Sequence, residues 1–291
     1  MEDNQQPSRT ALMSAAARAA HLVDDDAPSI FADPLAHAFL GKHAEELLGY
    51  HRSFGDHPVL SGARTTATTR SRYTEDQLAR LVGQGVSQYV ILGAGLDSFA
   101  YRSELADRVR VFEVDKSITQ RWKQQLLAET SAALPPSVAF VRIDLEQEPS
   151  SSLPDHLARA GFRCDEPALI SWLGVTMYVT LEAIQQTLAV LGGFAPGTEL
   201  VVEHLLPAGH RDEIGQAYAE LVMAATAEQG EPWKTFLTVE DMDTLLRVHG
   251  LRPVEHARQR DTVAPALWER TDTLCPFDLS ILSRATIPAR P

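Results

Sequence analysis

The sequence has few of the features that mark secreted or membrane proteins. Only two of its 291 residues are cysteines, Cys164 and Cys275, which is too few for a disulfide framework and offers no metal-ligand spacing. It contains no run of 18 or more apolar residues, so we expect no segment that spans a membrane. The alanine-rich stretch 10–23 is interrupted by Arg18 and His21, unlike a signal peptide. We therefore expect a cytoplasmic protein.

Basic residues are also scarce. The chain has 26 Lys and Arg against 39 Asp and Glu, a formal net charge of −13. No Lys/Arg run is able to neutralise a row of phosphates, which argues against a nucleic-acid partner. The Gly-Lys-Ser/Thr signature of nucleoside triphosphate sites is missing as well. No repeat or long linker divides the sequence, and its 44% hydrophobic content suits a substantial core, so we expect one domain over 1–291.

The strongest positive signal is a glycine turn between two apolar segments. Residues 88–98 read QYVILGAGLDS, and RVFEVD follows at 110–115. Gly93 and Gly95 allow a sharp turn and a close backbone approach to a ligand, and Asp115 is placed to accept hydrogen bonds from the hydroxyls of a ribose. The pattern predicts an adenosine cofactor. Ser98 stands where dinucleotide sites carry a third glycine, which argues against NAD.

Two later apolar segments also end in polar loops. They read FVRIDL at 140–145 and PALISWLGVTMY at 167–178. Ligands of open parallel sheets bind at the carboxyl ends of the strands, so these loops and the glycine turn should line one crevice. Asp97 has two interpretations, a cofactor contact or a cap of the following helix. The expected crevice residues are Gly93, Ala94, Gly95, Asp97, Asp115, Asp144, Gly174 and Tyr178.

Apolar segments alternate with helical patterns along the rest of the chain, which predicts an α/β fold with a parallel sheet. We expect strands at 88–92, 110–114, 139–143, 168–172, 199–204, 251–257 and 277–284. We expect helices at 117–129, 154–160, 180–191 and 238–249, the last opened by a Thr-x-x-Asp cap. Residues 1–80, with a first helix begun by Ser8, and the insertion 205–236, helical over 209–229, should form a cap and a lid.

Five motifs in order resemble the leucine carboxyl methyltransferase-like family of class I S-adenosylmethionine-dependent methyltransferases. They are RSRYTED at 70–76, VILGAGLD at 90–97, VFEVD at 111–115, DL at 144–145 and WLGVTMY at 172–178. The segments SRTAL at 8–12 and GEPWKTF at 230–236 extend the resemblance over nearly the whole chain. It implies a Rossmann-like, mostly parallel sheet of seven strands with an antiparallel edge, under a helical lid.

The resemblance also implies roles for the crevice residues. Gly93 and Gly95 would pass under the methionine part of S-adenosylmethionine, and Asp115 would hold its ribose. Asp144 and Leu145 would bracket the adenine, the carboxylate accepting from the amine while leucine covers the ring.

Two positions leave the cofactor contacts open. Either Arg70 or Arg72 would bind the carboxylate of the cofactor, for which a guanidinium is well shaped. Leu173 departs from the commoner family pattern, in which a glutamate precedes the glycine that is Gly174 here. A polar contact made by that glutamate is therefore missing.

The acceptor determines whether the reaction needs a base. A carboxylate is already ionised at pH 7, whereas an alcohol must lose a proton. His204 and Tyr178 are the candidate catalytic residues. The alternative for His204 is a place in the substrate wall or a structural role. No metal is required for methyl transfer.

We expect O-methylation of a small-molecule acceptor, carboxyl or hydroxyl, of secondary metabolism. The alternatives are a protein carboxyl methyltransferase and, from another class, an NAD-dependent oxidoreductase. A homodimer is compatible with the sequence. Trp233 is an aromatic candidate for the substrate pocket, with an anchor of its loop against the lid as the alternative.

Overall fold

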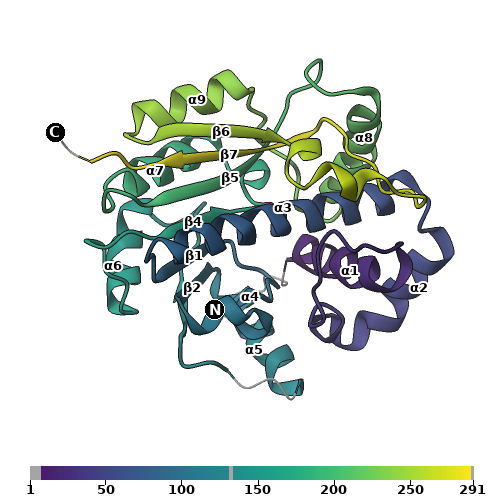
Figure 1. Ribbon diagram of the computed structural model, residues 1–291, viewed down its shortest axis with the longest axis horizontal. Coiled ribbons are helices and arrows are strands. Elements are labelled where there is room, and N and C mark those ends of the chain that lie inside the picture. The colour runs from purple at the N-terminus through teal and green to yellow at the C-terminus, as the bar shows by residue number, and fades with distance from the viewer. Residues whose placement is uncertain (1–7, 131–133, 290–291) are drawn as a thin grey trace.

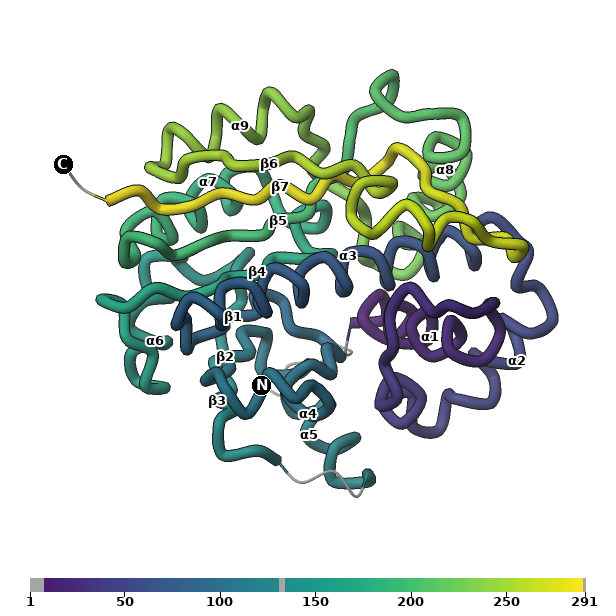
Figure 2. The backbone as a smooth tube through the Cα atoms, viewed as in Figure 1, coloured from purple at the N-terminus to yellow at the C-terminus, as the bar shows by residue number. Residues whose placement is uncertain are grey.

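The computed structural model describes residues 8–130 and 134–289. In this part of the chain seven strands form one sheet in the order β3-β2-β1-β4-β5-β7-β6. Figure 1 shows this order from β2 to β6, and Figure 2 also labels β3. β7 runs antiparallel to both of its neighbours, and the other adjacent pairs are parallel, which confirms the expected sheet. The strands are β1 (Gln88–Leu92), β2 (Arg110–Asp115), β3 (Val138–Arg142), β4 (Leu169–Trp172), β5 (Glu199–Leu205), β6 (Arg252–Arg258) and β7 (Ser280–Thr286).

Helices cover both faces of the sheet because the central strands are apolar on both sides. In β1, Val90 and Leu92 belong to one core cluster, whereas Tyr89 and Ile91 belong to another. The first cluster is covered by α6 (Leu153–Arg159), α7 (Leu181–Leu191) and α9 (Val239–Val248). The second is covered by α3 (Pro58–Gly83) and α4 (Phe99–Arg102), with α5 (Ser117–Glu129) beside them.

The remaining helices gather at the carboxyl end of the parallel strands. Figure 2 shows α1 (Arg9–Asp24), α2 (Ala44–Phe54) and α8 (Glu213–Glu228) at the right of the view, where the long α3 extends past the sheet. As expected, the Ser8 hydroxyl caps α1 by accepting a hydrogen bond from the Ala11 amide. No helix within 8–130 and 134–289 is long and apolar enough to cross a membrane.

The predicted boundaries agree with the structure within a few residues. The capping box of α9 is present, because Thr238 and Asp241 each accept from the other's amide. The last strand begins at Ser280 rather than at 277, since Phe277 packs on the Tyr218 ring of α8 and its amide donates to Gln259. α8 begins at Glu213, after an Asp212 cap, and not at 209.

A buried charged network holds α1 against the glycine turn. Asp33, whose side chain is fully buried, accepts from the Arg18 guanidinium at 2.8 Å and from the Ser98 hydroxyl at 2.6 Å. Arg18 also donates to the Leu96 carbonyl at 2.7 Å, and Arg102 donates to Ser98. Burial would raise the pKa of Asp33, but Arg18 and Arg102 overcome it and lower that pKa. The serine at the third glycine position therefore joins the turn to the N-terminal cap.

We predict that Asp33→Ala lowers the free energy of unfolding by about 3–5 kcal/mol, because it leaves the Arg18 charge buried without its partner. Urea denaturation measures the change. The matched control is Asp76→Ala, which breaks the exposed Arg72–Asp76 pair and should cost at most about 1 kcal/mol. Equal losses in the two variants would contradict the role of the network.

Candidate active site

The glycine turn after β1 and the acid that ends β2 form one hydrogen-bonded unit. Gly93 has a φ of +68°, and a Cβ there would lie 2.3 Å from Val175 Cγ2. Gly95 has a φ of +49°, and its amide donates to Asp115 Oδ2 at 2.6 Å. Asp115 Oδ1 accepts from the Lys116 amide at 2.7 Å. Both carboxylate oxygens of Asp115 keep lone pairs for a ligand, while burial raises its pKa.

A cavity of about 890 Å³ opens at this turn. Its walls come from the carboxyl ends of β1, β2, β4 and β5, from α1, α3 and α8, and from segment 228–234. Ten of the site residues that were predicted from the sequence line this cavity. They are Arg70, Gly93, Ala94, Gly95, Asp97, Asp115, Asp144, Leu145, Gly174 and Tyr178.

Two of these residues make local contacts that orient them. Asp97 Oδ1 accepts from the Phe99 amide at 2.8 Å and so holds the start of α4, although the residue also lines the cavity. Asp144 Oδ1 accepts from the Glu146 amide, and its Oδ2 lies 3.4 Å from Lys116 Nζ. Leu145 is nearly buried beside it. An acid next to an apolar side chain suits a flat ring with an exocyclic amine.

The structure separates the two candidate arginines. Arg70 lines the cavity, where it packs against Gly174 and donates to Ser14 and Glu203. Arg72 does not line the cavity; its guanidinium pairs with Asp76 on the surface of α3. Side chains two positions apart on a helix point about 200° apart around its axis, so only one of Arg70 and Arg72 could face the strands. The expectation that Arg72 contacts the cofactor does not fit its position.

His204 lies outside the cavity, contrary to the expectation that it serves as a base. It is 1% exposed, and its two ring nitrogens meet the Leu237 carbonyl and the Ser283 hydroxyl, each at 3.0 Å. Burial is the main cause that lowers the pKa of His204 to about 4. Its place in β5 points it between β7 and the start of α9, so the structural interpretation is the correct one.

Sequence reasoning overlooked Glu203, the residue before His204. Its side chain is 1% exposed and lines the cavity. One carboxylate oxygen, Oε2, accepts from Arg70 Nη1 at 2.9 Å and from the Gly174 amide at 2.7 Å. The available signal was an acid inside the apolar strand ELVVEHL, where a buried charge needs a partner.

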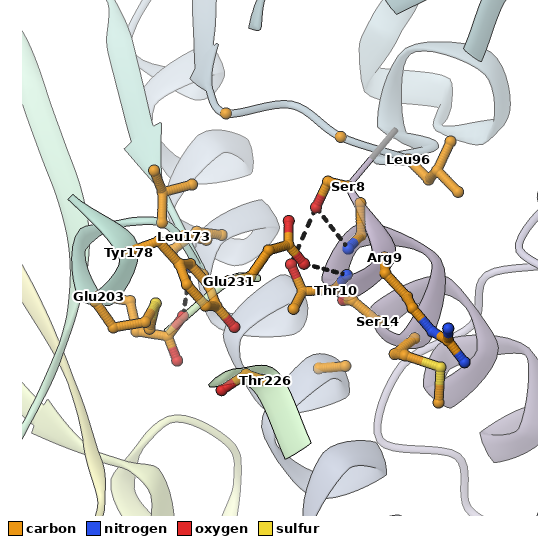
Figure 3. Close-up of a pocket in the computed structure, with 18 of the residues that line it drawn as sticks. Ser8, Arg9, Thr10, Ser14, Leu96, Leu173, Tyr178, Glu203, Thr226 and Glu231 are labelled. Carbon is orange, nitrogen blue, oxygen red and sulfur yellow. Dashed lines mark hydrogen bonds between the residues drawn. The ribbon is translucent and has the colours of Figure 1, made fainter. Parts of the chain in front are cut away.

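The N-terminal cap and the insertion meet across the cavity. Glu231 Oε2 accepts from the Thr10 amide at 3.0 Å, at the start of α1, as Figure 3 shows. The Ser8 and Thr10 hydroxyls are hydrogen-bonded beside it. A carboxylate suits this place because the amides at a helix N-terminus carry partial positive charge. Two segments 221 residues apart therefore close over the strand ends.

The part of the cavity under the insertion is largely apolar and aromatic. Burial raises the pKa of Tyr178, and the neighbouring Trp233 partly offsets that rise. Burial also raises the pKa of Tyr218. The apolar lining includes Met13, Leu60, Met177, Leu205, Val222, Ala225 and Leu279. No group of three or more potential metal ligands occurs among residues 8–130 and 134–289.

Comparison with known sequences identifies the family. The sequence model named "Leucine carboxyl methyltransferase" matches residues 11–192, more than half of the chain. The chain belongs to the leucine carboxyl methyltransferase family. It is 32% identical over 215 residues to the Bacillus subtilis protein named "Putative S-adenosyl-L-methionine-dependent methyltransferase YktD", which covers 73% of this chain and 69% of that protein. A Mycobacterium tuberculosis protein named "Putative S-adenosyl-L-methionine-dependent methyltransferase" is 31% identical over 245 residues, 79% of this chain and 70% of that protein.

Solved structures support the fold of this family member. A crystal structure titled as a putative methyltransferase from Thermobifida fusca superposes with a TM-score of 0.64 at 18% identity, covering 99% of this chain and 97% of that chain. A protein from Streptomyces avermitilis gives a TM-score of 0.65 at 14% identity, covering 97% and 98%. At these identities the similarity shows the fold alone.

Gly174→Ala is predicted to lower the affinity for S-adenosylhomocysteine by more than tenfold. The new Cβ would lie 2.7 Å from Arg70 Nη1, at a residue with a φ of +67°, and would displace the guanidinium. The control is Gly85→Ala, where φ is +95° and nothing lies within 4 Å of the Cβ; backbone strain there should cost about 1 kcal/mol of stability and leave affinity unchanged. Calorimetric titration measures both. If Gly174→Ala binds S-adenosylhomocysteine as tightly as wild type does, the position of Arg70 does not matter for cofactor binding.

The low pKa of His204 predicts a loss of stability in acid. The folded protein keeps the ring neutral down to about pH 4, whereas the unfolded chain takes up the proton near pH 6.5. The stabilisation is therefore complete above pH 6.5 and falls by about 3 kcal/mol as the pH drops to 4. Urea titrations at several pH values should show a shallower fall in His204→Gln than in the exposed control His210→Gln. If the stability of both variants falls equally steeply with decreasing pH, the loss of stability in acid does not come from His204.

Proposed function

We propose that this S-adenosylmethionine-dependent methyltransferase transfers its methyl group to an oxygen of a small, largely apolar acceptor that arrives as an anion. The observation that carries the proposal is the part of the cavity under the insertion, whose apolar walls hold two tyrosine hydroxyls. Carboxylic acids come first among such acceptors, and acidic phenols second. A small molecule of secondary metabolism has this chemistry.

The residues at the strand ends fit the cofactor. The glycine turn offers backbone where side chains would collide with Val175 or approach Ala11. Asp115 keeps free lone pairs for the two ribose hydroxyls, and Asp144 with Leu145 suits the adenine. Arg70 has N–H groups beyond those that meet Glu203 and Ser14, and these suit the carboxylate. When bound, S-adenosylmethionine would supply a methyl group on a sulfonium centre, so that an acceptor oxygen would attack the methyl carbon in line and S-adenosylhomocysteine would leave.

The residues around the acceptor position would orient an oxygen rather than remove a proton. Burial raises the pKa of Tyr178 and of Tyr218, so both hydroxyls stay protonated at neutral pH and donate hydrogen bonds to an anionic oxygen. His51 also lines the cavity, but burial and the neighbouring Arg64 lower its pKa to about 4, so it is a weak base. Arg64 also donates to the His51 ring. An acceptor that is already ionised needs no base.

The closed arrangement of the cavity favours a small acceptor over a protein. The Thr10–Glu231 hydrogen bond joins α1 to the insertion above the strand ends, and Lys234 pairs with Glu146 at 2.9 Å on the side of Asp144. A protein acceptor would have to thread a chain end beneath these contacts. A protein carboxyl methyltransferase remains the second candidate, because the name of the family refers to that reaction. Membership in a methyltransferase family replaces the oxidoreductase interpretation.

The test is an acceptor screen with methyl-labelled S-adenosylmethionine. Apolar aromatic and aliphatic carboxylic acids, the corresponding primary amides, phenols, and a short peptide with a C-terminal leucine should be compared. We expect the carboxylic acids to give labelled methyl esters. Treatment with base should hydrolyse these esters and release labelled, volatile methanol. Base-stable products would assign a phenol ether, and labelling of the peptide alone would favour a protein acceptor. Labelling of the amides on nitrogen would overturn O-methylation.

Replacing Tyr218 with Phe is predicted to lower kcat/KM for the best acceptor by about ten- to a hundredfold, because a hydrogen bond to an anion is worth about 1.5–3 kcal/mol. Affinity for S-adenosylhomocysteine should not change. Tyr50→Phe on α2 is the control, since Tyr50 is 57% exposed and does not line the cavity. Unchanged kinetics in Tyr218→Phe would remove its hydroxyl from the acceptor site.

A further inference from the structure

Glu203 carries a buried charge whose hydrogen bonds are only half satisfied. Its side chain is 1% exposed, and Oε2 is held by Arg70 and by the Gly174 amide. The other oxygen, Oε1, is buried and has no hydrogen-bond partner among the described residues. An unpaired oxygen of a buried carboxylate is costly, so its presence at the wall of a ligand cavity indicates a donor that arrives with the ligand.

The position of Glu203 defines the charge that this donor must have. A ligand anion bound by Arg70 would lie beside the Glu203 carboxylate, since the two side chains are 2.9 Å apart. Repulsion from a buried carboxylate would weaken the binding of a simple anion. A group that presents a carboxylate and an ammonium together matches the pair instead. The methionine part of S-adenosylmethionine is such a zwitterion.

We propose that Glu203 binds the α-ammonium group of the methionine part of the cofactor through Oε1, while Arg70 binds its α-carboxylate. The proposal rests on the cofactor, S-adenosylmethionine, and not on the identity of the acceptor. An ammonium hydrogen bond would satisfy the orphaned oxygen. Oε2 would continue to hold Arg70 in place, so one carboxylate serves both ends of the amino-acid group.

The surroundings of Gly174 agree with this arrangement. Leu173, at the end of β4, also lines the cavity but has no polar group, so β4 supplies no carboxylate there. Gly174 has no side chain, which lets the Arg70 guanidinium lie against the backbone where a Cβ would come within 2.7–3.0 Å. The carboxylate instead comes from the neighbouring strand β5, whose residue 203 reaches Arg70 and the Gly174 amide together.

The test combines changes in the protein with changes in the ligand. Calorimetric titration without acceptor should compare S-adenosylhomocysteine, its deaminated analogue and its decarboxylated analogue, using wild-type protein and Glu203→Gln. Glutamine keeps the shape of the side chain and removes its charge. Glu231→Gln is the matched control, because Glu231 is an acid of the same cavity that is committed to the Thr10 amide.

We expect Glu203→Gln to lower the affinity for S-adenosylhomocysteine by about ten- to a hundredfold, which corresponds to the loss of one charged hydrogen bond. The deaminated analogue should bind Glu203→Gln at least as tightly as wild type, because the variant removes the carboxylate that repels its anion. Glu231→Gln should not discriminate between ligands with and without the amine. Equal losses for S-adenosylhomocysteine and its deaminated analogue would mean that Glu203 only positions Arg70, and would overturn the proposal. So would undiminished binding of S-adenosylhomocysteine.

A second variant covers the case in which Glu203→Gln does not fold, as judged by circular dichroism. Glu203→Asp keeps the charge but shortens the side chain. It should lower the affinity for S-adenosylhomocysteine and leave the affinity for the deaminated analogue unchanged. If the deaminated analogue binds wild type as tightly as S-adenosylhomocysteine does, no residue of the protein binds the amine, and the proposal fails. Failure of every ligand to bind wild type would instead refute the cofactor assignment.

Discussion

The backbone turn between β1 and α4 is the constraint on which the site depends. Gly93 and Gly95 both take left-handed φ values, and the Gly95 amide donates to the carboxylate of Asp115. A side chain at residue 93 would collide with Val175. Because β1 and β2 are hydrogen-bonded neighbours, a shift of this turn would move Asp115 away from any ribose. The rest of the cavity is assembled around the turn, from α1 on one side to the end of β4 on the other.

Buried charges hold the N-terminal helices to that turn. Asp33, Arg18 and Ser98 join α1 to the residues after Gly95, and Arg70 joins α3 to β5 through Glu203. Each charge has a partner, which limits the cost of burial, and the loss of one partner would expose that cost. The pairs therefore specify where the cap lies as much as they stabilise it. A cap placed in this way gives the cavity its wall opposite the strands.

Much of the fold was readable from local patterns. Alternating apolar and helical segments predicted the seven strands, and the Ser8 and Thr238 caps appeared where expected. These signals are local, since they depend on periodicity and on hydrogen bonds between near neighbours. The last strand was misplaced at its start because Phe277, apolar like a strand residue, packs on α8 instead. A long-range contact of this kind leaves no trace in the local pattern.

The sequence by itself determined the family, the glycine turn and the row of strand ends, because these follow from ordered motifs and from the rule that ligands meet the carboxyl ends of parallel strands. Only the tertiary structure decided that Arg70 and not Arg72 faces the cavity, that His204 is enclosed beside Ser283, and that Glu203 faces Arg70. The direction of a side chain depends on the phase of its helix or strand against distant neighbours. That phase is set by packing between segments that are distant in the sequence, such as Arg70 and Glu203, which are 133 residues apart.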